Sequence, residues 1–183
     1  DLPIQHISDK ILKKMNRNTA SQQIKSLISK IRENIPGVAI RTSLIVGFPG
    51  ETEEDFNELL DFVQDTCFER LGVFVYSKEE QTRAYDFDKQ LSEEVKQQRF
   101  DGLMSLQQEI SSDLNRSYMG KNIEVLIDEK LEKHGNYIGR TQYDAPEVDG
   151  QVYVCSKNEL KPGDFVNVKI TDTLEYDLVG ETV

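Results

Sequence analysis

Polar or glycine-rich residues follow three strand-like stretches of the sequence, at the point where each stretch ends. In folds built from parallel strands and helices, ligands bind at the carboxyl ends of the strands. We therefore expect these residues to meet in one ligand site, although each cluster would be unremarkable by itself. The three clusters are Gln5-His6, Gly47-Phe48-Pro49-Gly50 and Tyr76-Ser77.

The turn at Gly47 is the clearest candidate for contact with a ligand. Glycine has no side chain, so a flat ligand could lie against the backbone there; a tight strand-to-helix turn without a ligand is the plain alternative. The turn is not a P-loop, because the lysine and the spacing of that motif are absent. Arg17 could hold a carboxylate if it points into the site, and is otherwise solvated.

Tyr76 and His6 are each open to two interpretations. Tyr76 either contacts a ligand or packs its ring in the core with its hydroxyl at the rim. A single histidine such as His6 is more often structural than catalytic. The sequence by itself identifies no catalytic residue and no metal ligand.

Alternating helix and strand patterns must position these clusters. Ser8 is predicted to cap the first helix, and Thr52 is predicted to cap a later one with Asp55 at the capping-box position. The apolar run at the end of the second strand predicts burial on both faces. This alternation with short loops indicates parallel βα units and the α/β class. We predict strands over Leu2–Ile4, Val38–Val46 and Leu71–Tyr76, and helices over Asp9–Met15, Thr19–Asn34, the segment after Thr52, and Ser92–Tyr118.

The pattern changes after Gly120, where short strands separated by turn residues replace the helices. Five short strands within about sixty residues are typical of a small antiparallel, OB-like β-barrel. We therefore predict two domains, residues 1–119 and residues 120–183. The predicted strands are Ile123–Ile127, Tyr137–Thr141, Val152–Cys155, Phe165–Ile170 and Tyr176–Thr182.

The motifs of the chain resemble, in order, those of the methylthiotransferase branch of radical-SAM enzymes. The likeness extends over the whole chain, and the last motif resembles the TRAM domain of the RimO type in particular. Asn18 stands where many relatives have Gly, and in Lys78–Arg83 relatives often have Gly before Thr. The motifs are Leu2–His6 with Ser8–Lys13 and Met15–Arg17, Arg41–Thr52, Phe74–Ser77, and Gly139–Thr141 with Asp144–Gly150.

This resemblance implies the C-terminal part of a partial TIM-like βα barrel, followed by a TRAM barrel. It implies a parent enzyme that uses S-adenosylmethionine and two [4Fe-4S] clusters to add a methylthio group to the β-carbon of an aspartate in small-subunit ribosomal protein S12. Cys67 and Cys155 match no cluster ligand of the family, so we expect this chain to bind no cluster and to be inactive alone. The residues implied to lie on the cofactor side are Gln5, His6, Arg17, Val46, Gly47, Phe48 and Tyr76.

The charge of the chain bears on its partners. The net charge is −11, which argues against non-specific binding to a nucleic-acid backbone. Residues 120–183 carry seven Lys or Arg and thirteen Asp or Glu, and an acidic barrel suits a basic ribosomal protein. We expect Asp144, Glu147 and Asp149 to bind that substrate, with a solvated loop as the alternative.

Two other functions remain open on the sequence alone. A tRNA methylthiotransferase of the MiaB type shares the barrel, and a non-catalytic OB-like binding module would need none of this chemistry. No run of about 18 apolar residues predicts a membrane span. Two isolated cysteines are read as buried, reduced thiols of a cytoplasmic protein. The first residue is Asp1 rather than Met, which we interpret as a piece cut from a longer protein.

Overall fold

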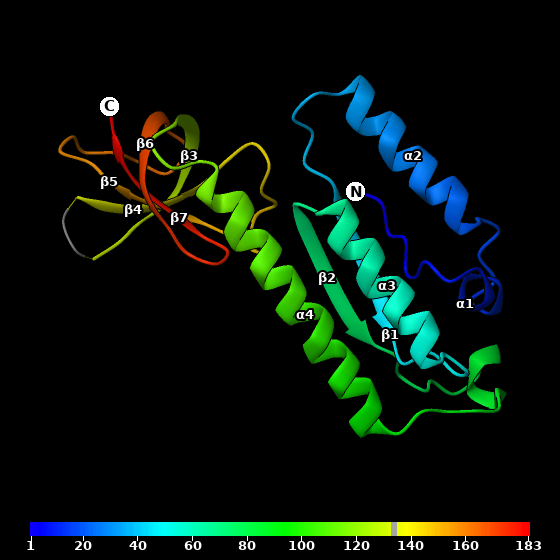
Figure 1. Cartoon of the computed structure of the whole chain (residues 1–183). Coiled ribbons are helices and arrows are strands. Elements are labelled where there is room, and N and C mark those ends of the chain that lie inside the picture. The colour runs from blue at the N-terminus through cyan, green and yellow to red at the C-terminus, as the bar shows by residue number, and fades with distance from the viewer. Residues whose placement is uncertain (133–134) are drawn as a thin grey trace. The chain divides into compact units, whose positions relative to one another are not determined.

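A computed structural model of the chain describes residues 1–132 and 135–183. The chain divides into two compact units, Asp1–Gln107 and Gln108–Val183, and each is described by itself. The long helix α4, Glu93–Arg116, contributes to both units (Figure 1). In the part of the chain that is described, no helix combines the length and the apolar character needed to cross a membrane.

The first unit is built from parallel βα units, as predicted. Strand β1 pairs in parallel with β2, with Arg41 opposite Arg70 and Val46 opposite Val75. Both helices predicted before β1 are present, and each begins and ends within two residues of its predicted bounds. The elements are α1 (Asp9–Lys14), α2 (Ser21–Asn34), β1 (Arg41–Val46), α3 (Glu53–Thr66), β2 (Arg70–Val75), the 3-10 helix η1 (Arg83–Asp86) and the first part of α4.

The predicted strand at Leu2–Ile4 is not a regular strand. The segment does lie along β1, because the Leu2 N–H donates to the Arg41 carbonyl at 2.8 Å and the Gln5 N–H donates to the Ser43 carbonyl at 2.9 Å. Its β-type pairing is limited to one parallel bridge, between Gln5 and Leu44. Pro3 has no N–H to add to a ladder, and Gln5 has a left-handed φ of 76°, so the ladder cannot continue.

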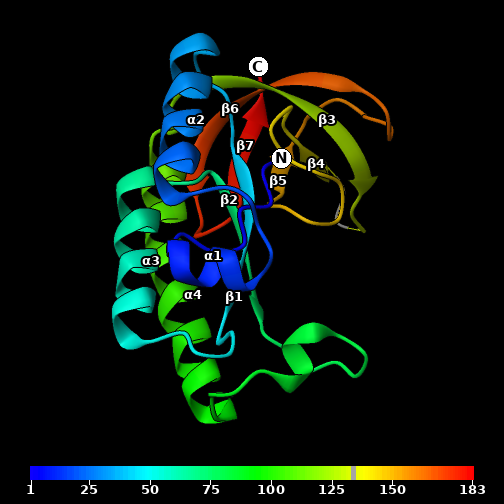
Figure 2. The same cartoon turned by 90° about the vertical axis from the view of Figure 1, so that its right-hand side faces the viewer.

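Strand β1 is buried on one face only, contrary to the two-sided burial that its apolar end predicted. Leu44 and Val46 are fully buried. Helices α2, α3 and the first part of α4 lie on one side of the two strands (Figures 1 and 2). On the other face Ile45 is half-buried, and Phe74 of β2, its partner in register, is 59% exposed.

Of the helix caps predicted at Ser8 and Thr52, the one at Thr52 is present. The Thr52 hydroxyl accepts a hydrogen bond from the Asp55 N–H at 3.3 Å, and the Asp55 carboxylate accepts one from the Thr52 N–H at 2.8 Å. Ser8 does not cap α1; its hydroxyl donates to the Asp55 carboxylate at 2.7 Å instead. Lys10 also forms an ion pair with Asp55. These contacts tie α1 to α3 and hold the pKa of Asp55 far below its usual range, although burial opposes the shift.

The second unit contains the predicted five-stranded barrel, which is closed in the order β3-β4-β5-β7-β6. Four of its pairings are antiparallel, and β5 pairs with β7 in parallel. A purely antiparallel barrel of five strands is impossible, because alternating directions cannot close around an odd ring. The strands are β3 (Asn122–Lys130), β4 (Asn136–Arg140), β5 (Val152–Cys155), β6 (Phe165–Thr173) and β7 (Leu178–Thr182).

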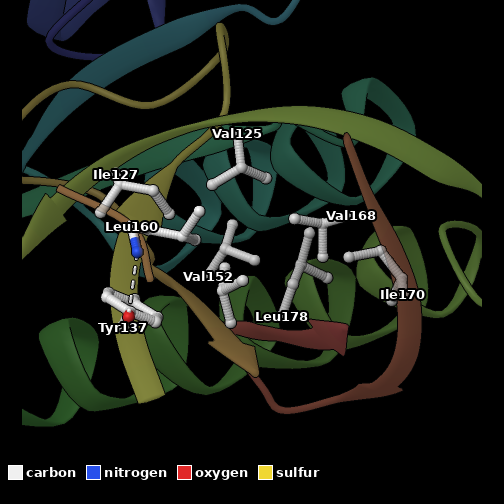
Figure 3. Close-up of a cluster of buried hydrophobic side chains, with 9 residues drawn as sticks. Val125, Ile127, Tyr137, Val152, Leu160, Val168, Ile170 and Leu178 are labelled. Atoms are coloured by element: carbon white, nitrogen blue, oxygen red, sulfur yellow. Dashed lines mark hydrogen bonds between the residues drawn. The ribbon is translucent and has the colours of Figure 1, made fainter. Parts of the chain in front are cut away.

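The barrel interior is filled by aliphatic side chains and one tyrosine (Figure 3). Tyr137 is 1% exposed, and its hydroxyl accepts a hydrogen bond from the Leu160 N–H at 3.1 Å. Burial of the ring is therefore possible without leaving its polar group unpaired. The other interior residues are Val125, Ile127, Val152, Val154, Leu160, Val168, Ile170 and Leu178.

Candidate functional site: a cavity at the strand ends

A cavity of about 640 Å³ lies in the first unit, where β1 and β2 end. Four of the seven residues expected on the cofactor side line it: Gln5, Arg17, Phe48 and Tyr76. The structure thus brings the three strand-end clusters to one place. His6, Val46 and Gly47 do not line the cavity. The remaining lining residues are Lys13, Lys14, Met15, Asn16, Ile45, Ser77, Glu79, Thr82, Arg83, Ala84 and Phe87.

Three aromatic rings form one part of the cavity wall. The rings of Phe48 and Tyr76 meet edge to face with centroids 5.1 Å apart, and Phe48 and Phe87 are 6.1 Å apart in a similar arrangement. Burial raises the pKa of the Tyr76 hydroxyl, and the nearby amide of Gln90 opposes the rise. Such rings offer apolar faces and edges to a flat heteroaromatic group. The sequence did not lead us to predict a role for Phe87. It could have been noticed as an aromatic residue within a polar loop.

Two features require glycine at position 47: the backbone conformation there and a neighbouring side chain. Its φ is 78°, a left-handed conformation that glycine adopts without steric cost. A Cβ atom here would collide with the side chain of Lys96. The Lys96 ammonium donates to the Tyr76 carbonyl at 3.2 Å and to the Glu93 carboxylate at 2.7 Å. The space beside Gly47 is therefore filled by Lys96, which differs from the expected contact between Gly47 and a flat ligand.

The turn itself is built around Glu51, to which sequence reasoning gave no role. Its side chain is fully buried. One carboxylate oxygen accepts from the N–H groups of Gly47 at 2.7 Å and of Phe48 at 3.0 Å. The other accepts from the Arg99 guanidinium at 2.9 Å. Burial raises the pKa of Glu51, while Arg99 and the two N–H groups oppose the rise. Glu51 therefore fixes the backbone that carries Phe48 into the cavity wall.

His6 is buried outside the cavity lining and is held in its neutral form. Its side chain is fully buried, and Nδ1 accepts a hydrogen bond from the Ser8 N–H at 3.0 Å. Nε2 lies 3.9 Å from the Glu51 carboxylate. Burial lowers the pKa of His6 to about 4, with Arg99 and Lys10 adding to the shift and Asp55 opposing it. The geometry gives His6 a positioning role next to Glu51 and no contact with the cavity.

The loop after β2 completes the cavity and contains one of the two positions that depart from the family resemblance. Gln81, at a position where the family resemblance leads us to expect Gly, has a left-handed φ of 67°. A residue with a side chain in this conformation is strained by about 1–2 kcal/mol. Asn18, the other departure, is not among the residues with positive φ; Asn16 is, with a φ of 59°. Asparagine tolerates this conformation well, so the turn after α1 needs no glycine.

The two cysteines are exposed, and not buried as predicted. Cys67 ends α3 with a left-handed φ of 50°, and its thiol donates to the Gln64 carbonyl at 3.1 Å. Over residues 1–132 and 135–183, no group of three or more His, Cys, Asp or Glu side chains could hold a metal ion. The described residues therefore do not fit an iron–sulfur cluster.

The predicted substrate-binding acids of the barrel unit differ in what they contact. The Asp144 carboxylate accepts from the N–H of Thr141 at 3.1 Å and from its hydroxyl at 2.6 Å. The Asp149 carboxylate accepts from the Ala145 N–H at 2.6 Å. Both carboxylates thus stabilise their own loop. Glu147 is exposed, with a φ of 62°.

Comparison with known proteins assigns a family to this arrangement. Residues 1–63 match the family model of the radical SAM superfamily, and residues 119–183 match that of the TRAM domain. Proteins named ribosomal protein uS12 methylthiotransferase RimO are 52% identical over 183 residues in Clostridioides difficile and 51% identical over 182 residues in Desulforamulus reducens. These matches cover 100% and 99% of this chain and 41% of each relative. The chain therefore belongs to the RimO family of radical-SAM methylthiotransferases.

Proposed function

We propose that this chain forms the nucleoside side and the substrate-docking part of an S-adenosylmethionine-dependent methylthiotransferase. In this proposal the complete enzyme adds a methylthio group to the β-carbon of an aspartate in ribosomal protein uS12. The observation that carries the proposal is the match of the whole chain, at about 50% identity, to proteins that bear this name. The chain spans about two fifths of their length, so the activity is proposed for the complete enzyme, acting in the cytoplasm.

The cavity at the strand ends fits the cofactor. Its volume of about 640 Å³ suits a ligand of this size, since such pockets usually measure about 300–1,000 Å³. We assign the adenine ring to Phe48 and Tyr76, and the methionine end to Gln5 and Arg17. His6, Val46 and Gly47, which do not line the cavity, are positioning residues. When bound, the cofactor supplies one-electron chemistry at carbon. The residues of this chain bind it, orient it and exclude water.

The proposal also gives the complete enzyme two [4Fe-4S] clusters. Because the described residues offer no ligand set for a cluster, we assign no residue of this chain to either and derive no step through them.

An acidic barrel surface supports a basic protein as the substrate. With seven basic and thirteen acidic residues over 120–183, the barrel would repel an RNA backbone and attract a basic ribosomal protein. Glu147 is the exposed acid of the predicted loop, and Asp144 and Asp149 support its conformation. This charge favours uS12 over tRNA, the substrate of MiaB-type relatives.

The cofactor assignment is tested by calorimetry on the complete enzyme with reconstituted clusters. Tyr76→Ala should weaken S-adenosylmethionine binding about tenfold or more, because removal of one buried aromatic contact costs more than about 1.4 kcal/mol. Phe74→Ala is the matched control, since Phe74 is exposed and does not line the cavity; it should change affinity less than about twofold. Equal effects of the two variants would contradict the assignment.

The substrate is tested by mass spectrometry of uS12 and of tRNA after incubation with the same enzyme. We expect methylthiolation of uS12 and none of tRNA. Glu147→Lys should slow the association with uS12 most clearly at low salt, because opposed charges act chiefly on the association rate. Modification of tRNA and not of uS12 would place the enzyme in the MiaB branch.

A further inference from the structure

Basic side chains gather at the strand-end cavity although the chain as a whole is acidic. The chain has 33 Asp and Glu against 22 Lys and Arg. The cavity wall reverses this balance, with four Lys or Arg side chains and a single carboxylate, that of Glu79. Glu79 accepts a hydrogen bond from the Ser77 hydroxyl at 2.6 Å. The wall therefore favours an anionic ligand.

Three of these four basic side chains have no partner within the described residues. Lys14 donates to the Pro49 carbonyl at 3.1 Å and so belongs to the turn. Lys13, Arg17 and Arg83 form no side-chain hydrogen bond or ion pair with any residue of 1–132 or 135–183. Arg17 is already assigned to the methionine end of the cofactor. Lys13 and Arg83 remain without a role, and they come from segments about seventy residues apart in sequence.

The loop that carries Arg83 is braced by its own hydrogen bonds. The Thr82 hydroxyl donates to the Glu79 carbonyl at 2.8 Å. The Gln90 amide donates to the carbonyls of Ala84 at 3.1 Å and Phe87 at 3.0 Å. A fixed backbone reduces the conformational entropy that a ligand must remove from Arg83 on binding.

We propose that Arg83, together with Lys13, forms a second anion subsite of this cavity, and that it binds the side-chain carboxylate of the substrate aspartate. The inference rests on the proposed function, which supplies the aspartate. A guanidinium can donate two parallel hydrogen bonds to a carboxylate, which fixes the orientation of that group. The β-carbon that is modified is bonded directly to this carboxylate, so Arg83 would position the reacting carbon. A nucleobase of tRNA has no carboxylate, so Arg83 would favour the protein substrate over tRNA.

The anion subsite is tested first without the substrate, in the complete enzyme that carries this chain. Phenylglyoxal modifies arginine side chains, and peptide mapping by mass spectrometry gives the rate at each one. Succinate should slow the modification of Arg83 about tenfold, equivalent to about 1.4 kcal/mol, and neutral succinamide should not. Arg116 is the internal reference, because its side chain is 65% exposed and paired with Asp113. Equal rates at Arg83 with and without succinate would overturn the subsite.

The same assay separates the two carboxylates that could occupy the subsite. S-adenosylmethionine alone should leave Arg83 reactive and should bind Arg83→Gln as tightly as the unmodified enzyme. If the cofactor alone protects Arg83 and its affinity falls in Arg83→Gln, the subsite holds the cofactor's carboxylate, and the assignment to the substrate is wrong.

The assignment to aspartate is tested with two uS12 peptides that differ only in aspartate or asparagine at the target position. The enzyme should bind the aspartate peptide about tenfold more tightly, as expected for one charge-assisted hydrogen-bonded pair. Arg83→Gln should abolish this preference, and Arg83→Lys should keep part of it. Lys78→Gln, the same charge change in the same loop, should leave it intact, because Lys78 lies over the Tyr85 ring and does not line the cavity.

The outcomes distinguish this inference from the function on which it rests. An undiminished preference for aspartate in Arg83→Gln would remove Arg83 from substrate binding and leave the proposed function standing. If neither peptide binds while succinate still protects Arg83, the anion subsite is real, but uS12 is not the substrate and the assignment to its aspartate fails.

Discussion

Arg99→Met should destabilise the first unit strongly, because it leaves a buried carboxylate without its cation. Arg99 is 6% exposed, and it donates to the Glu51 carboxylate at 2.9 Å and to the Glu51 carbonyl at 3.2 Å. Loss of one partner of a buried ion pair costs about 3–5 kcal/mol. We expect the lower end of this range, about 3 kcal/mol, because the N–H groups of Gly47 and Phe48 still donate to Glu51.

The loss of stability in Arg99→Met should increase with pH. Without Arg99, burial raises the pKa of Glu51 further above its ordinary value of 4.5, because the largest opposing influence is gone. The folded variant then binds a proton more tightly than the unfolded chain does. The stability of the variant is therefore closest to that of the unmodified protein below pH 4.5. The difference in stability grows as the pH rises through the pKa of Glu51 in the folded variant.

Amide hydrogen exchange measures this loss separately in each unit. The β1 amides, such as that of Leu44, should lose protection in Arg99→Met, more at pH 8 than at pH 5 after correction for the intrinsic exchange rate. Barrel amides, such as that of Val168, serve as the reference. Arg116→Met removes an exposed pair and should cost less than about 1 kcal/mol. A loss below about 1 kcal/mol for Arg99→Met at both pH values would refute the role given to the buried pair.

Three further results are expected from single sites. The pKa of His6 in the folded state is lowered to about 4, so the stability that neutral His6 contributes is present above pH 6.5 and is lost as the pH falls to 4. Urea unfolding should show a loss of up to about 3 kcal/mol in the free energy of unfolding over this range. Gly47→Ala should lower the free energy of thermal unfolding by more than about 1 kcal/mol, because the backbone at this position is left-handed and the added Cβ would collide with Lys96. Tyr137→Phe should lower the stability of the barrel, measured by amide hydrogen exchange, by about 1–3 kcal/mol, because the buried Leu160 N–H loses its acceptor.

The His6 prediction has a result that would contradict it, and the other two have a matched control variant. An NMR titration of the His6 ring near pH 6.5 would contradict its burial as a neutral side chain. Gly37→Ala separates the two causes at Gly47, since Gly37 has a φ of 76° and no neighbouring atom within 4 Å of an added Cβ. Tyr153→Phe, at a partly exposed tyrosine, should be nearly neutral, and an equal loss there would undermine the reasoning for Tyr137.

The sequence by itself determined the features that depend on near neighbours along the chain. The cap of α3 joins Thr52 and Asp55, three residues apart, and both residue types prefer this arrangement in any helix. The five barrel strands were predictable because alternating apolar residues and turn residues specify short strands locally. The same local patterns placed Gln5, Phe48 and Tyr76 at strand ends, where the cavity lies.

Only the tertiary structure decided which side chains meet across long separations. Glu51 and Arg99 are 48 residues apart, and the acid-rich sequence around the start of α3 gave no sign that the Glu51 side chain turns inward. The Ser8 hydroxyl was available to cap its own helix, yet it donates to Asp55, 47 residues away. Polarity along a chain predicts which side chains prefer water, but a buried ion pair forms only where two distant elements place opposite charges together. For that reason the cavity's location was predictable, whereas the Glu51 network behind it and Arg83 in its wall were not.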